Sequence, residues 1–159
     1  MNPLTRNLSR GLLPPTDPLT RLSQPFDPWE EVAADLSKLL LTNHLRGRIH
    51  ELPPFPLHNL HSEEDYWRAA TMLSYMTTLY VSDFNGQLAT TLPAVLAQPL
   101  VAVADHLRIP PILSYATQSM YNWRRIRPDQ PIKVGNLTLV QNFLGGVDEE
   151  WFVTLHLNI

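Results

Sequence analysis

The sequence predicts a mainly α-helical small domain with one or two short strands. Apolar residues recur with the 3.6-residue spacing of a helix in the longest segment between prolines, residues 63–81. Fifteen prolines among 159 residues, roughly twice the usual share of about 5%, divide the rest of the chain and favour several short helices. A chain of this length suits one domain, which buries roughly 68 to 70% of its unfolded surface.

Residues 1–25 are predicted to form an extended arm, because they carry five prolines. Such an arm folds only by lying along another surface. The first helix is predicted over residues 28–41, since Pro28 suits a first helical turn and Asp27 can cap it. Its apolar stripe consists of Val32, Leu36, Leu39 and Leu40.

A shorter helix should follow and end before Pro53 and Pro54. The strongest helical signal covers residues 63–81, with Ser62 as the N-cap. We expect this helix to be the central element of the domain. One stripe of it contains Tyr66, Ala69, Ala70, Leu73, Met76, Thr77 and Tyr80.

Two further helices are predicted over residues 99–107 and 112–125. Residues 137–143 alternate between apolar and polar positions like a strand, and the two glycines at 145–146 then turn the chain. The acids at 148–150 favour a helix start, although Val153 and Thr154 would also suit a strand.

The composition predicts an exposed apolar face and argues against two classes of function, nucleic-acid binding and hydrolysis. Charged residues make up only 17% of the chain, against a norm of about 25%, so we expect an uncovered apolar face. A net charge of −3, with no basic run longer than Arg124-Arg125, argues against a nucleic-acid partner. No phosphate-binding glycine loop or nucleophile elbow is found, which leaves a hydrolase with little support.

The absence of cysteine excludes disulfides, zinc fingers and a thiolate-ligated haem, and favours a reducing, cytoplasmic compartment. The longest apolar stretch, residues 92–104, is interrupted by prolines and is shorter than the roughly 20 residues of a membrane-spanning helix, so no membrane partner is expected. His58 and His61 have the spacing of a ligand pair, but they lie in a proline-rich loop without an obvious third ligand. We therefore predict no metal site there.

Several motifs occur in an order that resembles the N-terminal part of the indoleamine 2,3-dioxygenase family. The main ones are PPILSYA at 110–116, YNWR at 121–124 and DEEWF at 148–152, followed by His156. Shorter matches extend the resemblance over nearly the whole chain: RGLLP at 10–14, DPL at 17–19, Phe26, WE at 29–30, LR at 45–46, LP at 52–53, RA at 68–69 and YV at 80–81.

The resemblance implies that residues 26–147 form the family's helical small domain. It also implies that residues 148–159 are the truncated start of the first large-domain helix, beside the distal haem pocket, so a helix is preferred there. The family uses haem to insert dioxygen into the indole ring of tryptophan, giving N-formylkynurenine in the kynurenine pathway. Its haem-ligating histidine lies in a large domain beyond the end of this sequence. We expect the chain alone to be inactive and to need that domain, in cis or in trans.

Phe152 and His156 are the main candidate site residues. They are four positions apart, so they lie on one side of the segment whether it is a helix or a strand. The resemblance places both on the distal side of the haem, Phe152 against the substrate and His156 as a candidate catalytic residue that donates a hydrogen bond or moves a proton. Tyr115 and Ser119 would then line the indole side of the substrate.

The same residues can also be explained by purely structural roles, without a binding or catalytic site. His156 would then be an ordinary half-buried histidine, Phe152 a core residue, and Tyr115 a helix anchor whose hydroxyl bonds to backbone. The alternative function is a haem-free protein-interaction module that keeps the small-domain fold and binds another protein through its apolar face. A third alternative, an unstable relic, predicts aggregation.

Overall fold

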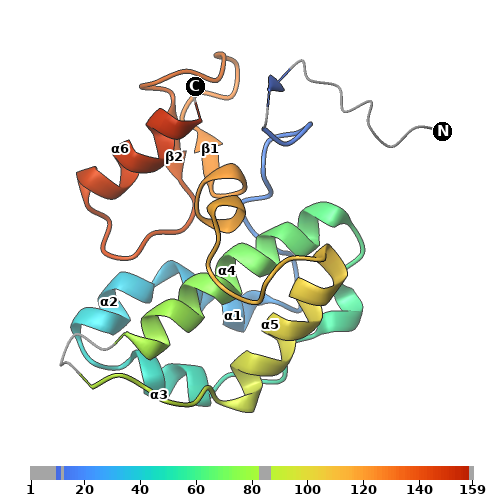
Figure 1. The fold of residues 1–159 in the computed structure, drawn as a ribbon, viewed down its shortest axis with the longest axis vertical. Helices are drawn as coiled ribbons and strands as arrows, with labels where there is room; N and C mark the ends of the chain where they lie inside the picture. The colour runs from blue at the N-terminus through green and yellow to red at the C-terminus, as the bar shows by residue number, and fades with distance from the viewer. Residues whose placement is uncertain (1–9, 12, 83–86, 158–159) are drawn as a thin grey trace.

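The structure, a computed structural model, describes residues 10–11, 13–82 and 87–157. It is mainly helical and carries one two-stranded sheet, so the predicted fold class is confirmed. Figure 1 shows the five helices α1 to α5 together in one part of the molecule, with α6 and the sheet in the other. No helix among these described residues is long and apolar enough to cross a membrane. The elements are α1 (Asp27–Ala34), α2 (Leu36–Leu41), α3 (Leu45–His50), η2 (Leu57–Asn59), α4 (Glu63–Val81), α5 (Ala94–Leu107), η3 (Ala116–Met120), β1 (Trp123–Arg125), β2 (Leu137–Leu139) and α6 (Val147–His156).

The helix α4 is the central element, as predicted, and it begins and ends at the predicted residues. Ser62 and Asp65 form a capping box: the Ser62 hydroxyl accepts from the Asp65 N–H at 3.1 Å, and the Asp65 carboxylate accepts from the Ser62 N–H at 3.0 Å. The middle of α4 is buried on nearly every side, and α5 runs beside it (Figure 1). This helix therefore organises the packing of the others.

The single helix predicted over residues 28–41 is wrong, because the chain breaks at Asp35 into α1 and α2. Aspartate competes for backbone hydrogen bonds inside a helix and so favours such a break. Asp27 does not cap α1 either; its carboxylate instead pairs with Arg21 at 2.7 Å. The predicted apolar stripe survives the break, since Val32, Leu36 and Leu40 are buried.

The helix α5 ends at Leu107 as predicted but starts five residues before the expected position, at Ala94. Pro99 therefore lies inside the helix instead of opening it. A proline there removes one backbone hydrogen bond. The ring of Pro99 is buried in the structure, and this packing offsets part of that loss.

The helix predicted over residues 112–125 is wrong over most of its length. Only η3 is helical, a single turn of π-helix, and β1 follows it as an antiparallel partner of β2 with Trp123 opposite Leu139. The predicted strand at 137–143 is correspondingly reduced to β2. Gly145 turns the chain with a φ of 73°, and α6 confirms the preferred helix after it.

Two hydrophobic clusters hold the fold. The larger lies among α1 to α5 and includes the fully buried Trp29. The smaller joins Trp123 and Leu137 of the sheet to Val153 and Leu157 at the end of the chain. The arm contacts both clusters, because Leu22 is buried in the larger one and Leu13 packs on the smaller one. Residues on both sides of position 148 thus share one cluster.

Candidate functional site

The structure brings three of the four candidate residues together on one exposed face. Tyr115 immediately precedes η3, while Phe152 and His156 lie on α6. The ring of His156 is 4.5 Å from that of Phe152 and 6.1 Å from that of Tyr115, measured between ring centroids. Tyr115 and Phe152 remain 49% and 46% exposed. These three rings therefore form an open aromatic surface that a ligand or another domain can contact.

The helix backbone favours one tautomer of His156. Its Nδ1 contacts the carbonyl oxygen of Phe152, one helical turn earlier. Because a carbonyl oxygen can only accept, Nδ1 must carry the proton. The Nε2 of a neutral His156 is then an acceptor, and the ring donates from Nε2 only when it is protonated.

Ser119, the fourth candidate, is placed differently. Its side chain is fully buried, and its hydroxyl has no hydrogen-bond partner among the described residues. In this conformation Ser119 belongs to the interior of the domain, whereas Tyr115 four residues earlier is at the surface. An unpaired buried hydroxyl costs about 1–3 kcal/mol, which marks this turn as a place where packing is incomplete.

Part of the exposed apolar surface of the described residues lies on α6. Trp151, Phe152 and Leu155 are all at least 44% exposed, and Val147 is exposed at the start of the helix. The opposite side of α6 is anchored, since Val153 is fully buried. The exposed side chains of this helix therefore continue the aromatic surface of the candidate site.

A buried polar network supports the candidate site from behind. Both carboxylate oxygens of Glu149 on α6 accept from the Phe143 N–H, at 3.0 Å each. The hydroxyl of Tyr75, on α4, also donates to this carboxylate. Asn122 donates to the same hydroxyl at 2.9 Å. The network ties α6 to α4 and to the segment after η3, and so joins the two elements that carry Tyr115 and His156.

Burial changes the acid–base properties of this network. Removal of the carboxyl from water raises the pKa of Glu149 above its ordinary value, although the hydrogen bonds from Phe143 and its neighbours act in the opposite direction. Burial also raises the pKa of Tyr75, and the nearby Glu149 adds to this rise. Tyr75 is therefore a neutral hydrogen-bond donor, and the charged form of Glu149 is the costly one.

Replacing Glu149 by glutamine is expected to change how stability depends on pH. A raised pKa in the folded state means that the protonated carboxyl favours folding, and this contribution is lost as the pH rises from the ordinary value of 4.5 through the folded pKa. Urea unfolding from pH 4.5 to pH 7 should therefore show wild type losing stability relative to Glu149→Gln.

The matched variants are Glu149→Ala and Glu150→Gln. Alanine removes the acceptor of the Phe143 N–H, so a loss of about 1–3 kcal/mol is expected. Glutamine at the neighbouring Glu150 should leave the pH profile of wild type unchanged. A Glu149→Gln profile that runs parallel to that of wild type would contradict the assigned role.

Sequence reasoning missed this network. The run of three acids at 148–150 predicted a helix start, but nothing in it indicated that the carboxylate of the middle one accepts from the Phe143 N–H. Nothing in the local sequence pattern distinguishes Asn122. Among the described residues, no group of three or more histidines, cysteines, aspartates or glutamates is placed to hold a metal ion.

Comparisons with known proteins identify the family of the chain. A family model described as Indoleamine 2,3-dioxygenase matches residues 7–159. The chain is 32% identical over 144 residues to Indoleamine 2,3-dioxygenase 2 of Homo sapiens and 30% identical over 154 residues to Indoleamine 2,3-dioxygenase acdA of Aspergillus candidus. It is also 32% identical over 151 residues to Indoleamine 2,3-dioxygenase of Saccharomyces cerevisiae.

These alignments cover 90%, 91% and 89% of this chain but only 35%, 37% and 33% of the three relatives. The chain thus spans about a third of the length of the curated relatives that it matches. The family model accounts for nearly all of it, including the segments that carry Tyr115, Phe152 and His156. This chain belongs to the indoleamine 2,3-dioxygenase family.

Proposed function

We propose that this chain supplies the distal wall of a haem-dependent dioxygenase site that oxidises tryptophan or a related indoleamine to the N-formylkynurenine type of product. The observation that carries the proposal is the convergence of Tyr115, Phe152 and His156 on one exposed face in a member of this family. Phe152 and Tyr115 would hold the flat indole ring by apolar contact. Ser119 would back this wall from the interior.

The residues present fit one side of a haem. Two exposed aromatic rings and a histidine offer a largely apolar surface whose polar groups are the Tyr115 hydroxyl and the Nε2 of His156. Bound haem would supply the activation of dioxygen, while the protein orients the indole and excludes water. The neutral His156 would accept a proton or hydrogen bond at Nε2 and return it, because Nδ1 is held by the Phe152 carbonyl.

The remainder of the site would come from a large haem-binding domain, in cis or in trans. Two observations support this. The relatives are about three times as long as the aligned segment, and α6 presents exposed apolar side chains beside His156. Such a surface is typical of one that another domain covers. We therefore infer that residues 10–157 alone bind haem poorly and turn over no tryptophan.

Reconstitution tests this function. The chain alone, mixed with haem and a reductant, is expected to give no well-defined Soret band and no N-formylkynurenine. Addition of the C-terminal two-thirds of the Saccharomyces cerevisiae relative should produce both. In that complex His156→Ala should lower kcat on the order of 10²-fold, as expected for a residue that moves a proton.

The control variant is His106→Ala. His106 is exposed and stacks on Tyr66 on another part of the surface, with ring centroids 3.5 Å apart, so its loss should leave kcat unchanged. Turnover of tryptophan by the isolated chain would contradict the need for a second domain. A His156→Ala complex as active as wild type would contradict the role of His156.

A haem-free interaction module is the second candidate, favoured by the same exposed side chains of α6. In that case the apolar face would bind another protein directly. Three results would distinguish such a module: it would stay monodisperse, bind no haem in the presence of the supplied large domain, and lose its protein partner when Trp151 is replaced by a charged residue.

A further inference from the structure

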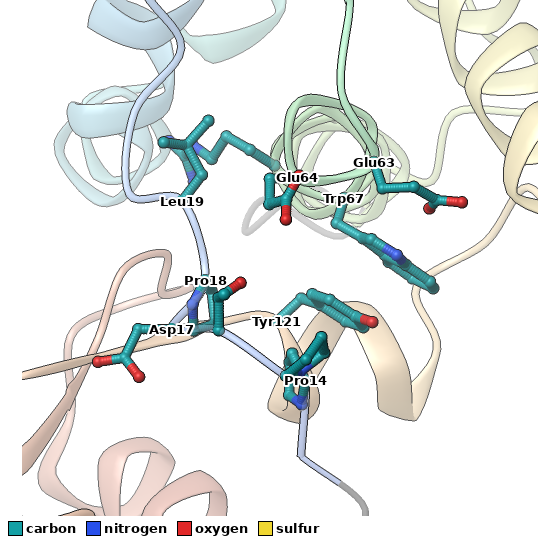
Figure 2. Close-up of a pocket in the computed structure, with 11 residues that line it drawn as sticks. Pro14, Asp17, Pro18, Leu19, Glu63, Glu64, Trp67 and Tyr121 are labelled. Carbon is teal, nitrogen blue, oxygen red and sulfur yellow. The ribbon is translucent and has the colours of Figure 1, made fainter. Parts of the chain in front are cut away.

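A cavity that shares no lining residue with the candidate site lies beneath the N-terminal arm (Figure 2). One wall is the arm itself, another is the first two turns of α4, and Tyr121 closes a third side. The cavity encloses about 190 Å³, less than the roughly 300 Å³ at which drug-sized pockets begin, so its ligand must be small. The lining residues are Pro14, Pro15, Thr16, Asp17, Pro18, Leu19, Glu63, Glu64, Trp67, Arg68 and Tyr121.

The walls of the cavity suit a flat apolar ring. Trp67 and Tyr121 are stacked, with ring centroids 3.9 Å apart and planes only 3° from parallel. In Figure 2 the arm passes Tyr121 at Pro14 and continues through Pro18 to Leu19, and these arm residues line the cavity together with the two rings. Prolines and a preformed aromatic stack lose little conformational entropy on binding, so they form a rigid apolar slot.

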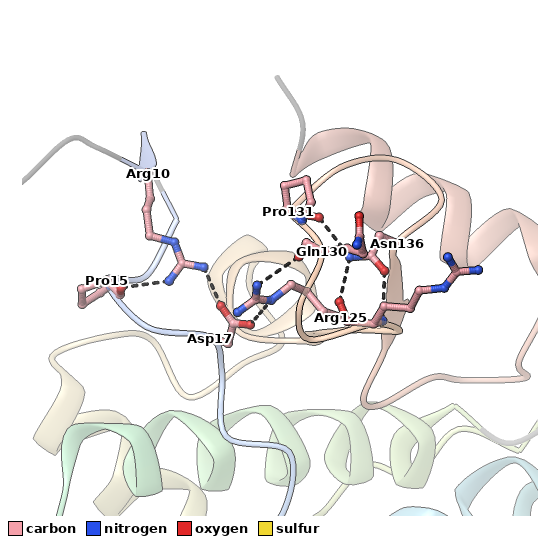
Figure 3. A network of polar contacts seen from close by, with 8 residues as sticks. Arg10, Pro15, Asp17, Arg125, Gln130, Pro131 and Asn136 are labelled. Atoms are coloured by element: carbon pink, nitrogen blue, oxygen red, sulfur yellow. Dashed lines mark hydrogen bonds and ion pairs between the residues drawn. The ribbon is translucent and has the colours of Figure 1, made fainter.

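Most of the charge around the cavity is already neutralised. Arg68 is paired with Glu30, with N–O distances of 3.0 and 2.5 Å. Asp17 is held between Arg10 and Arg125 at 2.6 Å each (Figure 3). The charges of Asp17 and Arg68 are thus already paired, although Arg68 Nη1 has no acceptor among the described residues.

Glu64 is the exception. Its carboxylate points into the cavity in Figure 2, whereas the carboxylate of Glu63 points away. Glu64 forms no ion pair with a base in the described part of the chain. An anionic ligand would be repelled by this carboxylate, whereas an ammonium group would be attracted both to it and to the aromatic rings.

We propose that the cavity beneath the arm binds a small organic ammonium ion whose apolar ring lies against Trp67, Tyr121 and the arm prolines while its charge pairs with Glu64. No part of this proposal depends on haem or on a second domain. It assigns the chain a ligand site separate from the surface formed by Tyr115, Phe152 and His156.

Because the arm forms a wall, ligand binding and docking of the arm must favour each other. The two ion pairs of Asp17, with Arg10 and with Arg125, form a clamp that holds the arm in place (Figure 3). Burial opposes ionisation of Asp17, but the hydrogen bonds from the two arginines outweigh it and hold the pKa of this carboxyl below its ordinary value. The clamp is therefore fully charged at neutral pH.

The test compares three ring compounds of similar size that differ in charge: benzylammonium, benzyl alcohol and benzoate. Binding is followed by NMR titration of the Trp67 indole N–H at pH 7. Benzylammonium should bind most tightly and benzoate least. Glu64→Gln should weaken benzylammonium about two- to fivefold, the worth of an exposed ion pair, and should leave benzyl alcohol unchanged.

Glu63→Gln is the matched control, since the neighbouring carboxylate points away from the cavity, and its affinities should equal those of wild type. Asp17→Asn should weaken benzylammonium and benzyl alcohol alike by releasing the arm. Amide spectra of each variant report whether the fold is intact. Equal affinity for all three compounds, equal losses for the Glu63 and Glu64 variants, or shifts confined to residues outside the cavity would overturn the proposal.

Discussion

Replacing Arg68 by methionine is expected to destabilise the fold by about 3–5 kcal/mol. Arg68 and Glu30 form an ion pair in the interior, with side chains only 4% and 2% exposed. Methionine fills much of the same volume but leaves the Glu30 carboxylate buried without a counter-ion. A domain of this size has a total stability of about 5–15 kcal/mol, so the variant should be close to unfolding at room temperature.

The ion pair also connects the arm to the helices. Glu30 lies on α1 and accepts from the backbone N–H of Leu22 at 2.8 Å, while Arg68 comes from α4. Loss of the pair should therefore free the arm as well as lower stability. Urea unfolding gives the free energy, and protection of the Leu22 amide against hydrogen exchange reports the arm.

The double variant Glu30→Met with Arg68→Met separates the charge from the packing. Removal of both partners leaves no buried charge and should recover a large part of the loss, apart from the Leu22 N–H, which loses its acceptor. Arg68 Nη1 has no acceptor among the described residues, so the pair is not fully satisfied even in wild type. A loss below about 1 kcal/mol for Arg68→Met would contradict this account.

The helix α4 could be predicted from the sequence because every local signal agrees with its tertiary role. Ser62 and Asp65 cap it, its stripe is apolar, and no proline or glycine interrupts it. For α6 the local signals conflicted, because the acids favoured a helix and Val153 and Thr154 suited a strand, and the family resemblance decided for the helix. Where local and long-range signals agree, the sequence is a sufficient guide to the element.

The structure of the segment from η3 through β1 could not be predicted, because long-range contacts determine it. Trp123 has a helical pattern around it, yet it is fully buried against Val153 and Leu157, thirty residues later. Pairing with Leu139 in the sheet turns the chain out of the helix. No local pattern contains this information, because the partner strand and α6 lie far along the chain.

For the candidate site, spacing alone placed Phe152 and His156 on one side of a helix, and the structure has them there. The approach of Tyr115 to His156 came from the resemblance and not from periodicity. The inward turns of Ser119 and Glu149 depend on how η3 and α6 pack on the domain. Such rotations are set by tertiary packing, which a single sequence does not encode locally.

Asn122→Ala is expected to cost about 3 kcal/mol or more, because one side chain satisfies several buried groups. Asn122 is fully buried. Its Nδ2 donates to the carbonyl of Gln141 at 2.8 Å and to the hydroxyl of Tyr75 at 2.9 Å, and its Oδ1 accepts from the Gln141 N–H at 2.7 Å. Alanine leaves the carbonyl and the N–H of Gln141 without these partners in the interior, at about 1–3 kcal/mol each, and removes the donor to the Tyr75 hydroxyl, which keeps its bond to Glu149.

Asn122→Asp distinguishes hydrogen bonding from volume, since aspartate has nearly the same shape. It can still accept from the Gln141 N–H, but it faces the Gln141 carbonyl and the Tyr75 hydroxyl with a carboxylate that has no donors. At pH 7 it also buries a charge near Glu149, so it should cost at least as much stability as alanine.

Urea unfolding measures the loss of stability in both variants. Because this network joins η3 to α6, hydrogen exchange of the α6 amides should accelerate in both variants. Asn142→Ala should leave it unchanged, because the Asn142 side chain accepts from Ser37 and takes no part in the network. An Asn122→Asp protein within about 0.5 kcal/mol of wild type would mean that the side chain serves packing alone.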